Sequence, residues 1–363
     1  MGGVSGSSAV LARFGVGLVL VCILVMGGCA TDAPPPDVTG QVEPSSPPAA
    51  QYRVVAMGLA APWSIAFAGR TALISERDTA RVLELVDGHT RVVGTVPGVH
   101  GTGEGGLLGI AVHNRELFAY HTAGTQNRIV AFRLVGAPGH LSLGRMRTVL
   151  SGIPAAATHN GGRIAFGPDG MLYATTGDAG RPRSAQDPDS LAGKILRMTP
   201  SGEAPADNPF GGSVVYTLGH RNVQGIAWAP DGTMYASEFG ADRADELNRI
   251  EPGRNYGWPS VEGVGRRDGF TDPLQTWPPE DASPSGIAVV GGEVVIANLR
   301  GERLRTVSLT RPRWVAELHA GEFGRLRDVV LAPDGQVWVL TNNTDGRGSP
   351  GAGDDRIIGI SLG

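Results

Sequence analysis

The sequence predicts an all-β fold, specifically a six-bladed β-propeller of four-stranded antiparallel blades. Glycine accounts for 55 of the 363 residues, about twice its usual share of about 7%, which indicates many tight turns. From Tyr52 onward, short β-branched or alternating runs are separated by Gly, Asp-Gly and Pro-Asp-Gly turns, with no convincing amphipathic helix. A strand-turn-strand phrase also recurs six times, which is the signature of a repeat architecture.

The six phrases follow one another along the chain. They are SIAFAGRTALISER from Ser64, GIAVHNRELFAYHT from Gly109, RIAFGPDGMLYATTGD from Arg163, GIAWAPDGTMYASEFG from Gly225, GIAVVGGEVVIANLR from Gly286 and DVVLAPDGQVWVLTNN from Asp328. Pro presets the first turn residue and Asp-Gly accepts the next, so we interpret the three Pro-Asp-Gly turns as purely structural. The phrases lie 42 to 62 residues apart, which fits propeller blades.

Composition excludes several classes of protein. Hydrophobic residues make up 41% of the chain and charged residues 18%, so a sizeable core can form and wholesale disorder is excluded. The net charge of -4 provides no basic surface for nucleic acid. The chain has no Walker loop, HExxH, CxxC or GxSxG motif, and nucleotides, NAD and structural zinc therefore lose support.

The amino terminus has the pattern of a bacterial lipoprotein. Arg13 is the only charged residue before Asp32, and it precedes an apolar run that ends in MGGC at Cys29. We therefore interpret residues 1–28 as a lipoprotein signal peptide and Cys29 as the lipidated residue. The alternative is an uncleaved signal anchor.

The remaining residues divide into two parts. Residues 29–51 are rich in proline and read as a disordered tether, and residues 52–363 form the predicted propeller domain. This organisation predicts an extracytoplasmic protein that is anchored to the cell membrane by lipid alone.

The first polar cluster is THNGGR, which contains His159, together with TTGD, which ends at Asp178 one hairpin later. A hairpin could return Asp178 beside His159. A carboxylate bonded to one imidazole nitrogen fixes the tautomer and leaves the other nitrogen as a base. A purely structural His-Asp pair is the alternative.

Three further clusters carry polar side chains near the predicted blade starts. GHRNVQG places Arg221, Asn222 and Gln224 at the mouth of one blade, where a hydrogen-bonded loop is the alternative. Residues 237–259 offer carboxylates and main-chain carbonyls that could bind calcium, although their spacing matches no EF-hand. Arg325 and Arg327 have strand spacing and share a face, which suits an anionic ligand or pairing with acidic neighbours.

These clusters join a longer series of motifs. In order, GEGGLLGIAV, HNGGRIAFGPDG, TTGD, LAGKILRM, ADNPF, YTLGHRNVQGIAW, SEFG, NYGWP and GRLRDVVLAPDG resemble the soluble quinoprotein glucose and aldose sugar dehydrogenases, the glucose/sorbosone dehydrogenase family. The resemblance runs from about Tyr52 to Ile360, and GHRNVQG is its most specific motif. It implies a six-bladed propeller that binds pyrroloquinoline quinone (PQQ) and calcium and oxidises aldose sugars at C1 to lactones. Electrons would pass to an unidentified acceptor.

The resemblance also implies a role for individual residues. His159 would be the general base, Asp178 the carboxylate that orients it, and Arg221 the cation beside the reacting quinone carbonyl. Further cofactor contacts would be Asn222, Gln224, Arg325 and Arg327. The carbonyls of Gly240 and Ala241 would bind the cofactor's calcium, and Glu246 and Tyr256 a second, structural calcium.

Four positions depart from the glucose-oxidising branch. Arg300 stands where a lysine contacts the cofactor, and Glu104 stands where a glutamine reaches toward the substrate. We place both with the cofactor-binding residues. Thr158 replaces an aspartate before the base, and Ala241 replaces a proline at the calcium carbonyls.

Two other functions stay open. A propeller that has lost its cofactor could act as a cell-surface module that binds a ligand or a protein, and the altered Thr158 and Arg300 favour that reading. A calcium-dependent lactonase or other hydrolase is the third possibility. It would need carboxylate or amide side chains around an axial metal, whereas these motifs are richer in arginine.

Overall fold

A computed structural model describes residues 52–361, and it confirms the predicted propeller. These residues form 24 strands in six four-stranded antiparallel sheets, with one short 3-10 helix, η1 (Pro182–Gln186). The predicted signal peptide, Cys29 and the tether at 29–51 lie outside the described residues. No helix within 52–361 is both long and apolar enough to cross a membrane.

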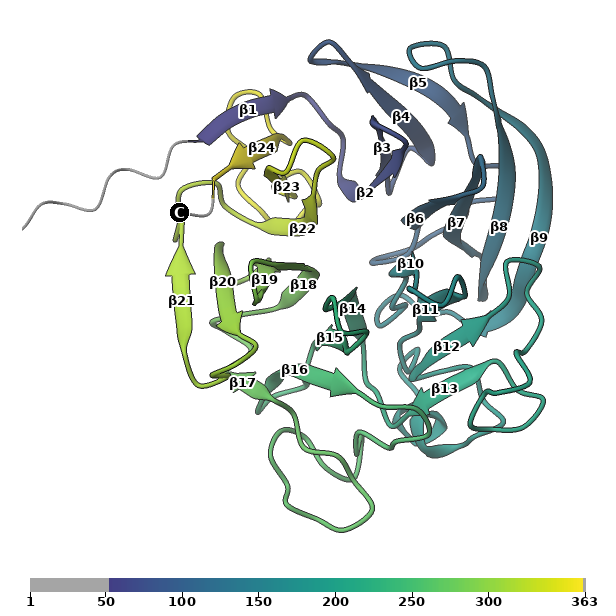
Figure 1. The fold of residues 1–363 in the computed structure, drawn as a ribbon, viewed down its shortest axis with the longest axis vertical. Coiled ribbons are helices and arrows are strands. Elements are labelled where there is room, and N and C mark those ends of the chain that lie inside the picture. Colours follow the sequence, from purple (N-terminus) through teal and green to yellow (C-terminus); the bar gives the residue numbers. More distant parts are fainter. Residues whose placement is uncertain (1–51, 362–363) are drawn as a thin grey trace, which may run out of the picture. The chain divides into compact units, whose positions relative to one another are not determined.

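The sheets are arranged around an axis as blades, numbered here along the chain (Figure 1). Blade one contains β2 (Pro62–Ala68), β3 (Thr71–Glu76), β4 (Arg81–Val86) and β5 (His89–Thr95). Blade two contains β6 (Leu107–His113), β7 (Glu116–Ala123), β8 (Gln126–Val135) and β9 (Ser142–Pro154). Blade three contains β10 (Ile164–Phe166), β11 (Leu172–Thr175), β12 (Lys194–Met198) and β13 (Val215–Leu218).

The second half of the ring repeats this order. Blade four contains β14 (Val223–Trp228), β15 (Met234–Glu238), β16 (Asp245–Ile250) and β17 (Gln275–Trp277). Blade five contains β18 (Pro284–Val290), β19 (Glu293–Asn298), β20 (Arg303–Ser308) and β21 (Val315–Leu318). Blade six contains β22 (Leu326–Leu331), β23 (Val337–Thr341), β24 (Ile357–Ile360) and β1 (Tyr52–Ala56).

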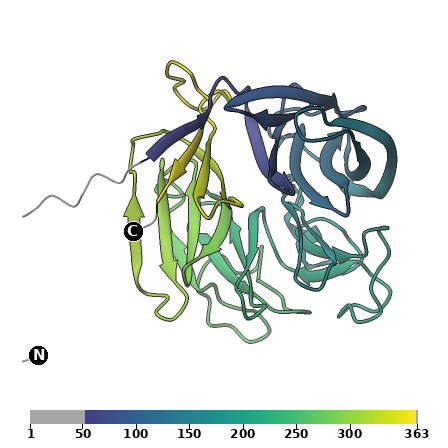
Figure 2. The same ribbon diagram turned by 45° about the horizontal axis from the view of Figure 1, so that its top comes forward.

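The two ends of the described chain close the ring together. Strand β1 pairs with β24, with Tyr52 opposite Ile360, and it becomes the outer strand of blade six. Figures 1 and 2 both show β1 beside β24. Because the remaining strands of that blade come from the carboxyl-terminal end, the closing hydrogen bonds join residues about 300 positions apart.

Each recurring phrase forms the two inner strands of one blade. The six hairpins are β2–β3, β6–β7, β10–β11, β14–β15, β18–β19 and β22–β23. Successive blades share apolar clusters, such as Leu73 and Val82 of blade one against Leu107 and Leu117 of blade two. The inner strands are therefore buried on both faces, which accounts for their hydrophobic runs.

The axis itself is polar. The Arg163 guanidinium in blade three donates to Asp328 Oδ2 in blade six over 2.9 Å, and to Ser64 Oγ over 3.1 Å. Arg163 also stacks over the Trp63 ring, with its Cζ 4.4 Å from the ring centroid. This buried ion pair joins blades three and six across the axis.

Candidate active site at the propeller axis

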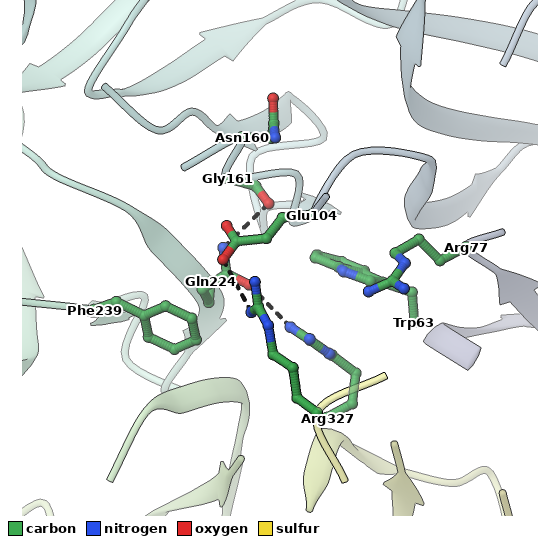
Figure 3. A pocket seen from close by; sticks show the side chains of 9 residues that line it. Trp63, Arg77, Glu104, Asn160, Gly161, Gln224, Phe239 and Arg327 are labelled. Atoms are coloured by element: carbon green, nitrogen blue, oxygen red, sulfur yellow. Dashed lines mark hydrogen bonds and ion pairs between the residues drawn. The ribbon is translucent and has the colours of Figure 1, made fainter. Parts of the chain in front are cut away.

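Most of the predicted polar residues gather at one end of the axis, although Arg325, Glu246 and Tyr256 do not line the two spaces found there. Because the hairpins are antiparallel, the start of each inner strand and the end of the second strand lie at the same edge of a blade. Loops from these positions line a cleft of about 220 Å³ that is bordered by His159, Arg221, Asn222 and Arg300. A narrower pocket adjoins it and is lined by Glu104, Arg327 and other residues shown in Figure 3.

His159 and Asp178 lie in contact, as the hairpin spacing predicted. His159 Nδ1 is 2.7 Å from Asp178 Oδ1. His159 has a φ of +58°, which is uncommon for a residue with a side chain. A Cβ on Gly177 would come within 1.9 Å of the His159 carbonyl oxygen, so only glycine lets these two loops pack so closely.

The Asp178 carboxylate is fully buried and accepts three hydrogen bonds. Its Oδ1 also accepts from Gly180 N at 2.8 Å, and its Oδ2 accepts from Trp258 Nε1 at 2.8 Å. Burial alone would raise the pKa of Asp178, but the bonds from His159, Gly180 and Trp258 outweigh it, and the pKa lies below its ordinary value.

A charged Asp178 decides which imidazole nitrogen is free. A carboxylate can only accept, so Nδ1 of His159 must carry the hydrogen, and Nε2 then holds a lone pair. Among the residues that the structure describes, Nε2 of His159 has no hydrogen-bond partner, and the side chain is 19% exposed toward the cleft. The arrangement can therefore take a proton from a group bound in the cleft.

Arg221, Asn222 and Gln224 lie beside this pair. Arg221 donates to the Phe239 carbonyl at 3.3 Å, and its backbone N–H donates to Glu238 Oε1. Asn222 Oδ1 accepts from Gly161 N at 3.0 Å, whereas its Nδ2 is buried without a partner in the described chain. That unpaired donor points to a missing acceptor at the site.

Arg325 and Arg327 meet at one carboxylate. Arg325 lies 3.1 Å from Asp345 Oδ2 and Arg327 lies 4.0 Å from the same oxygen. Arg327 also donates to Gln224 Oε1 at 3.1 Å. Burial, reinforced by the neighbouring guanidiniums of Arg325 and Arg77, lowers the pKa of Arg327 to about 9.

Arg325 and Arg327 thus pair in part with an acidic neighbour, which was the alternative to binding an anionic ligand. Around the pocket, however, arginine side chains outnumber carboxylates. Arg77 and Arg327 both line this pocket, and Figure 3 shows Arg327 extending between Trp63 and Phe239 while Arg77 lies beside Trp63. Arg77 pairs with Asp78 at the rim. The pocket is consequently suited to an anionic ligand.

Glu104 and Arg300 border the cleft from opposite blades. Glu104 Oε2 accepts from the His159 backbone N–H at 2.9 Å, and its Oε1 lies 3.0 Å from Arg347. Arg300 is exposed and makes no ion pair within residues 52–361. Both therefore lie where a bound ligand would meet them.

The residues predicted to bind calcium occupy two separate places. Gly240 and Ala241 line the cleft, and their N–H groups donate to Asp245 and Glu262. No hydrogen bond to either carbonyl oxygen occurs in the described chain, so both oxygens are free for a cation.

Glu246 and Tyr256 instead border a small cavity with Glu238, and this cavity shares Arg221 and Gly240 with the cleft. Burial and the neighbouring Glu238 raise the pKa of Glu246 to about 8. The Tyr256 hydroxyl donates to the Arg249 carbonyl at 2.7 Å. Nowhere in the described range do three or more His, Cys, Asp or Glu side chains form a metal-binding group.

Three residues contribute to the site without having been predictable from local sequence patterns. Trp258 and Glu238 belong to the motifs NYGWP and SEFG, which carry the family resemblance but predict no role for these two side chains. The pairing of Arg347 with Glu104 had no local signal, because these residues lie in different blades and 243 positions apart. Tertiary contact alone brings all three to the site.

Comparison with known proteins places this geometry in context. The family model described as "Glucose / Sorbosone dehydrogenase" matches residues 59–349. The PQQ-bound aldose sugar dehydrogenase of Streptomyces coelicolor is 48% identical, covering 87% of this chain and 99% of that chain, with a TM-score of 0.81. A putative oxidoreductase (glucose dehydrogenase) of Thermus thermophilus is 42% identical over 86% and 100%, with a TM-score of 0.80. An aldose sugar dehydrogenase of Escherichia coli is 29% identical over 78% and 88%.

Proposed function

The chain belongs to the glucose/sorbosone dehydrogenase family, and from this premise we propose that it is a PQQ- and calcium-dependent enzyme that oxidises aldose sugars at C1 to lactones. One observation carries the proposal. The His159 imidazole is held by a buried carboxylate at 2.7 Å and presents its other nitrogen to a cleft bordered by arginines. A base and several cations that converge on one cleft suit oxidation of an alcohol beside an anionic cofactor.

The pocket fits the cofactor by its chemistry. PQQ carries three carboxylates and a quinone, and when bound it supplies a two-electron acceptor for the C1 hydride. Arg325 and Arg327 would hold carboxylates, since the single Asp345 between them leaves positive charge in excess. The buried Nδ2 of Asn222, which has no partner in the described chain, would donate to a cofactor oxygen. Gln224, Arg300 and Glu104 would complete the contacts.

His159 would act as the general base. As the C1 hydroxyl loses its proton, the O–H bond breaks and the proton moves to His159 Nε2. Asp178 keeps Nδ1 protonated and stabilises the imidazolium that results. Arg221, fixed through Phe239 and Glu238, would place a positive charge next to the negative charge that develops.

The proposal includes two calcium sites. Ca²⁺ binds oxygen ligands, including main-chain carbonyls and carboxylates. The free carbonyl oxygens of Gly240 and Ala241 in the cleft support one site. Glu246 supports a second, since a buried carboxylate beside Glu238 has no cation to neutralise it in the described chain.

The proposed location follows from the sequence. The signal pattern and Cys29 favour an extracytoplasmic lipoprotein. A Cys29→Ala change should release the protein from the membrane fraction without altering the specific activity of the propeller. Retention of the variant in membranes would contradict lipid anchoring.

Titration of the purified, cofactor-free protein tests the function. PQQ and calcium are added while dye reduction is followed over a panel of aldoses. Saturable PQQ binding with sugar-dependent dye reduction is the expected result. Absence of binding at micromolar PQQ with calcium present would instead favour the cell-surface binding module. Lactone hydrolysis without dye reduction would favour a hydrolase.

A further inference from the structure

One side chain outside the predicted site touches two of its three catalytic candidates. The indole Nε1–H of Trp258 donates to Asp178 Oδ2 at 2.8 Å. The same ring lies against Arg221, whose guanidinium carbon is 5.5 Å from the ring centroid, within the range of a cation-π contact. Trp258 lies on the long connection between β16 and β17 of blade four, whereas Asp178 follows β11 of blade three.

The backbone at Trp258 is fixed on both sides. Its N–H donates to the Gly219 carbonyl at 2.9 Å, and its carbonyl accepts from Gln186 Nε2 at 2.6 Å. Gln186 and Asn255 exchange amide hydrogen bonds of 2.7 and 3.0 Å. These bonds tie the connection to η1 and to the end of β13 in blade three, so the backbone that carries the indole is held in place.

The two carboxylate oxygens of Asp178 have different hydrogen-bond donors, and Oδ2 depends on Trp258. Oδ1 is shared by His159 and Gly180, while Trp258 is the partner of Oδ2 in the described part of the chain. The terminal torsion of an aspartate is broad, so one donor per oxygen is needed to hold the plane of the carboxylate. A rotated carboxylate would no longer keep His159 aimed at the cleft.

We propose that Trp258 is a positioning residue that locks the Asp178 carboxylate with its N–H and the Arg221 guanidinium with its ring. The two contacts use different parts of one side chain, which couples the orientation of the base to the position of the cation. This inference rests on the proposed function, because both partners are assigned there. A space-filling role, by contrast, would depend on the volume of the ring alone.

Two substitutions separate the N–H from the ring. Trp258→Phe keeps an aromatic face for Arg221 but removes the donor to Asp178. We expect kcat to fall roughly tenfold, with little change in PQQ affinity. We also expect the acid limb of the pH profile to move to higher pH, because an Asp178 carboxylate with one donor fewer attracts a proton on the His159–Asp178 pair more strongly. Trp258→Leu should lower kcat further, since Arg221 also loses its support.

Trp228→Phe is the matched control, because Trp228 of blade four packs against Tyr173 of blade three and neither lines the cleft. It should leave both kcat and the pH profile unchanged. If Trp258→Phe lowers kcat without moving the acid limb, the side chain only fills space and the inference is overturned.

A measurement on the unaltered, cofactor-free protein does not depend on turnover or on the folding of a Trp258 variant. The indole N–H signal of Trp258, assigned by nuclear magnetic resonance, should follow the protonation of Asp178 as pH falls, and it should shift in Asp178→Asn. An indole signal that shifts neither with pH nor in Asp178→Asn would contradict the hydrogen bond between Trp258 and Asp178. Failure of the proposed function would appear separately, as absence of sugar-dependent dye reduction in the wild-type protein.

Discussion

The two sides of the cleft are built in different ways. On the His159 side, formed by blades three and four, Asp178 has a donor for each carboxylate oxygen and Arg221 is fixed by Phe239 and Trp258. On the Arg327 side, formed mainly by blade six, the guanidiniums of Arg325 and Arg327 share Asp345. Asp178 and Arg221 on the first side are fixed by protein groups alone, whereas the second side has positive charge in excess.

This difference separates catalysis from binding. A preorganised base and cation lower a barrier because no reorganisation is needed as charge develops. Buried guanidiniums that are not neutralised by carboxylates destabilise the folded protein, and an anionic ligand that pairs with them removes this destabilisation. We therefore expect changes on the His159 side to affect kcat, and changes on the Arg327 side to affect affinity.

The largest effect should come from the base. His159→Asn removes the proton acceptor, and kcat should fall about a hundredfold to ten-thousandfold, while PQQ affinity changes less than about threefold. Stopped-flow dye reduction and a fluorescence titration measure the two quantities. His89→Asn, an exposed histidine on β5, is the control. Equal losses of kcat and PQQ affinity would contradict the assignment of catalysis to the His159 side and of binding to the Arg327 side.

The next effect concerns the opposite side. Arg327→Met should weaken PQQ binding about tenfold to a hundredfold, because a charged hydrogen bond is lost. The rate at saturating PQQ should stay within about threefold of wild type. The thermal stabilisation that PQQ provides should shrink accordingly. Arg303→Met, which breaks a pair with Glu317 away from the cleft, should change neither. A large fall in kcat for Arg327→Met would contradict the division of roles.

A smaller effect should appear in the pH dependence of stability. The pKa of Asp178 is lowered in the folded protein from its ordinary 3.8, so its charged form stabilises the fold above that value. This contribution is lost as pH falls through the folded-state pKa. Asp178→Asn should thus be destabilised by a constant amount between about pH 5 and 8, and the difference should shrink below about pH 4.

Urea unfolding at several pH values measures this difference, with the exposed Asp268→Asn as the control. A difference that persists undiminished into acid would mean that the carboxylate charge does not organise the His159 side.

The smallest effect should come from the pair that connects the two sides. Glu104→Gln keeps an oxygen that can accept from the His159 N–H but loses the charge that faces Arg347. Because Arg347 is half exposed, the free energy of unfolding should change by less than about 1 kcal/mol. PQQ affinity should rise about twofold, since one competing negative charge is removed. Calorimetric titration of both proteins measures the change, and weaker binding would show that the negative charge of Glu104 favours cofactor binding instead of opposing it.

Patterns within short stretches of sequence predicted most of the fold and the His159–Asp178 pair of the site. The six hairpins were predictable because turn chemistry and hydrophobic runs lie within each phrase. His159 and Asp178 were predictable as a pair for the same reason, since one hairpin joins them. The partners of Asp178 and Arg327 were not predictable, because Trp258 lies 80 positions from Asp178 and Gln224 lies 103 positions from Arg327.

The sequence by itself determined the number of blades, the inner hairpins and the residues that could perform acid-base chemistry. All of these depend on interactions between residues that are near one another along the chain. Tertiary structure alone decided that β1 closes blade six, that Arg163 reaches Asp328 across the axis, and that Trp258 supports both Asp178 and Arg221. The first two contacts exist only once the ring is closed, because closure brings distant blades around one axis, whereas the Trp258 contacts require blades three and four to pack side by side.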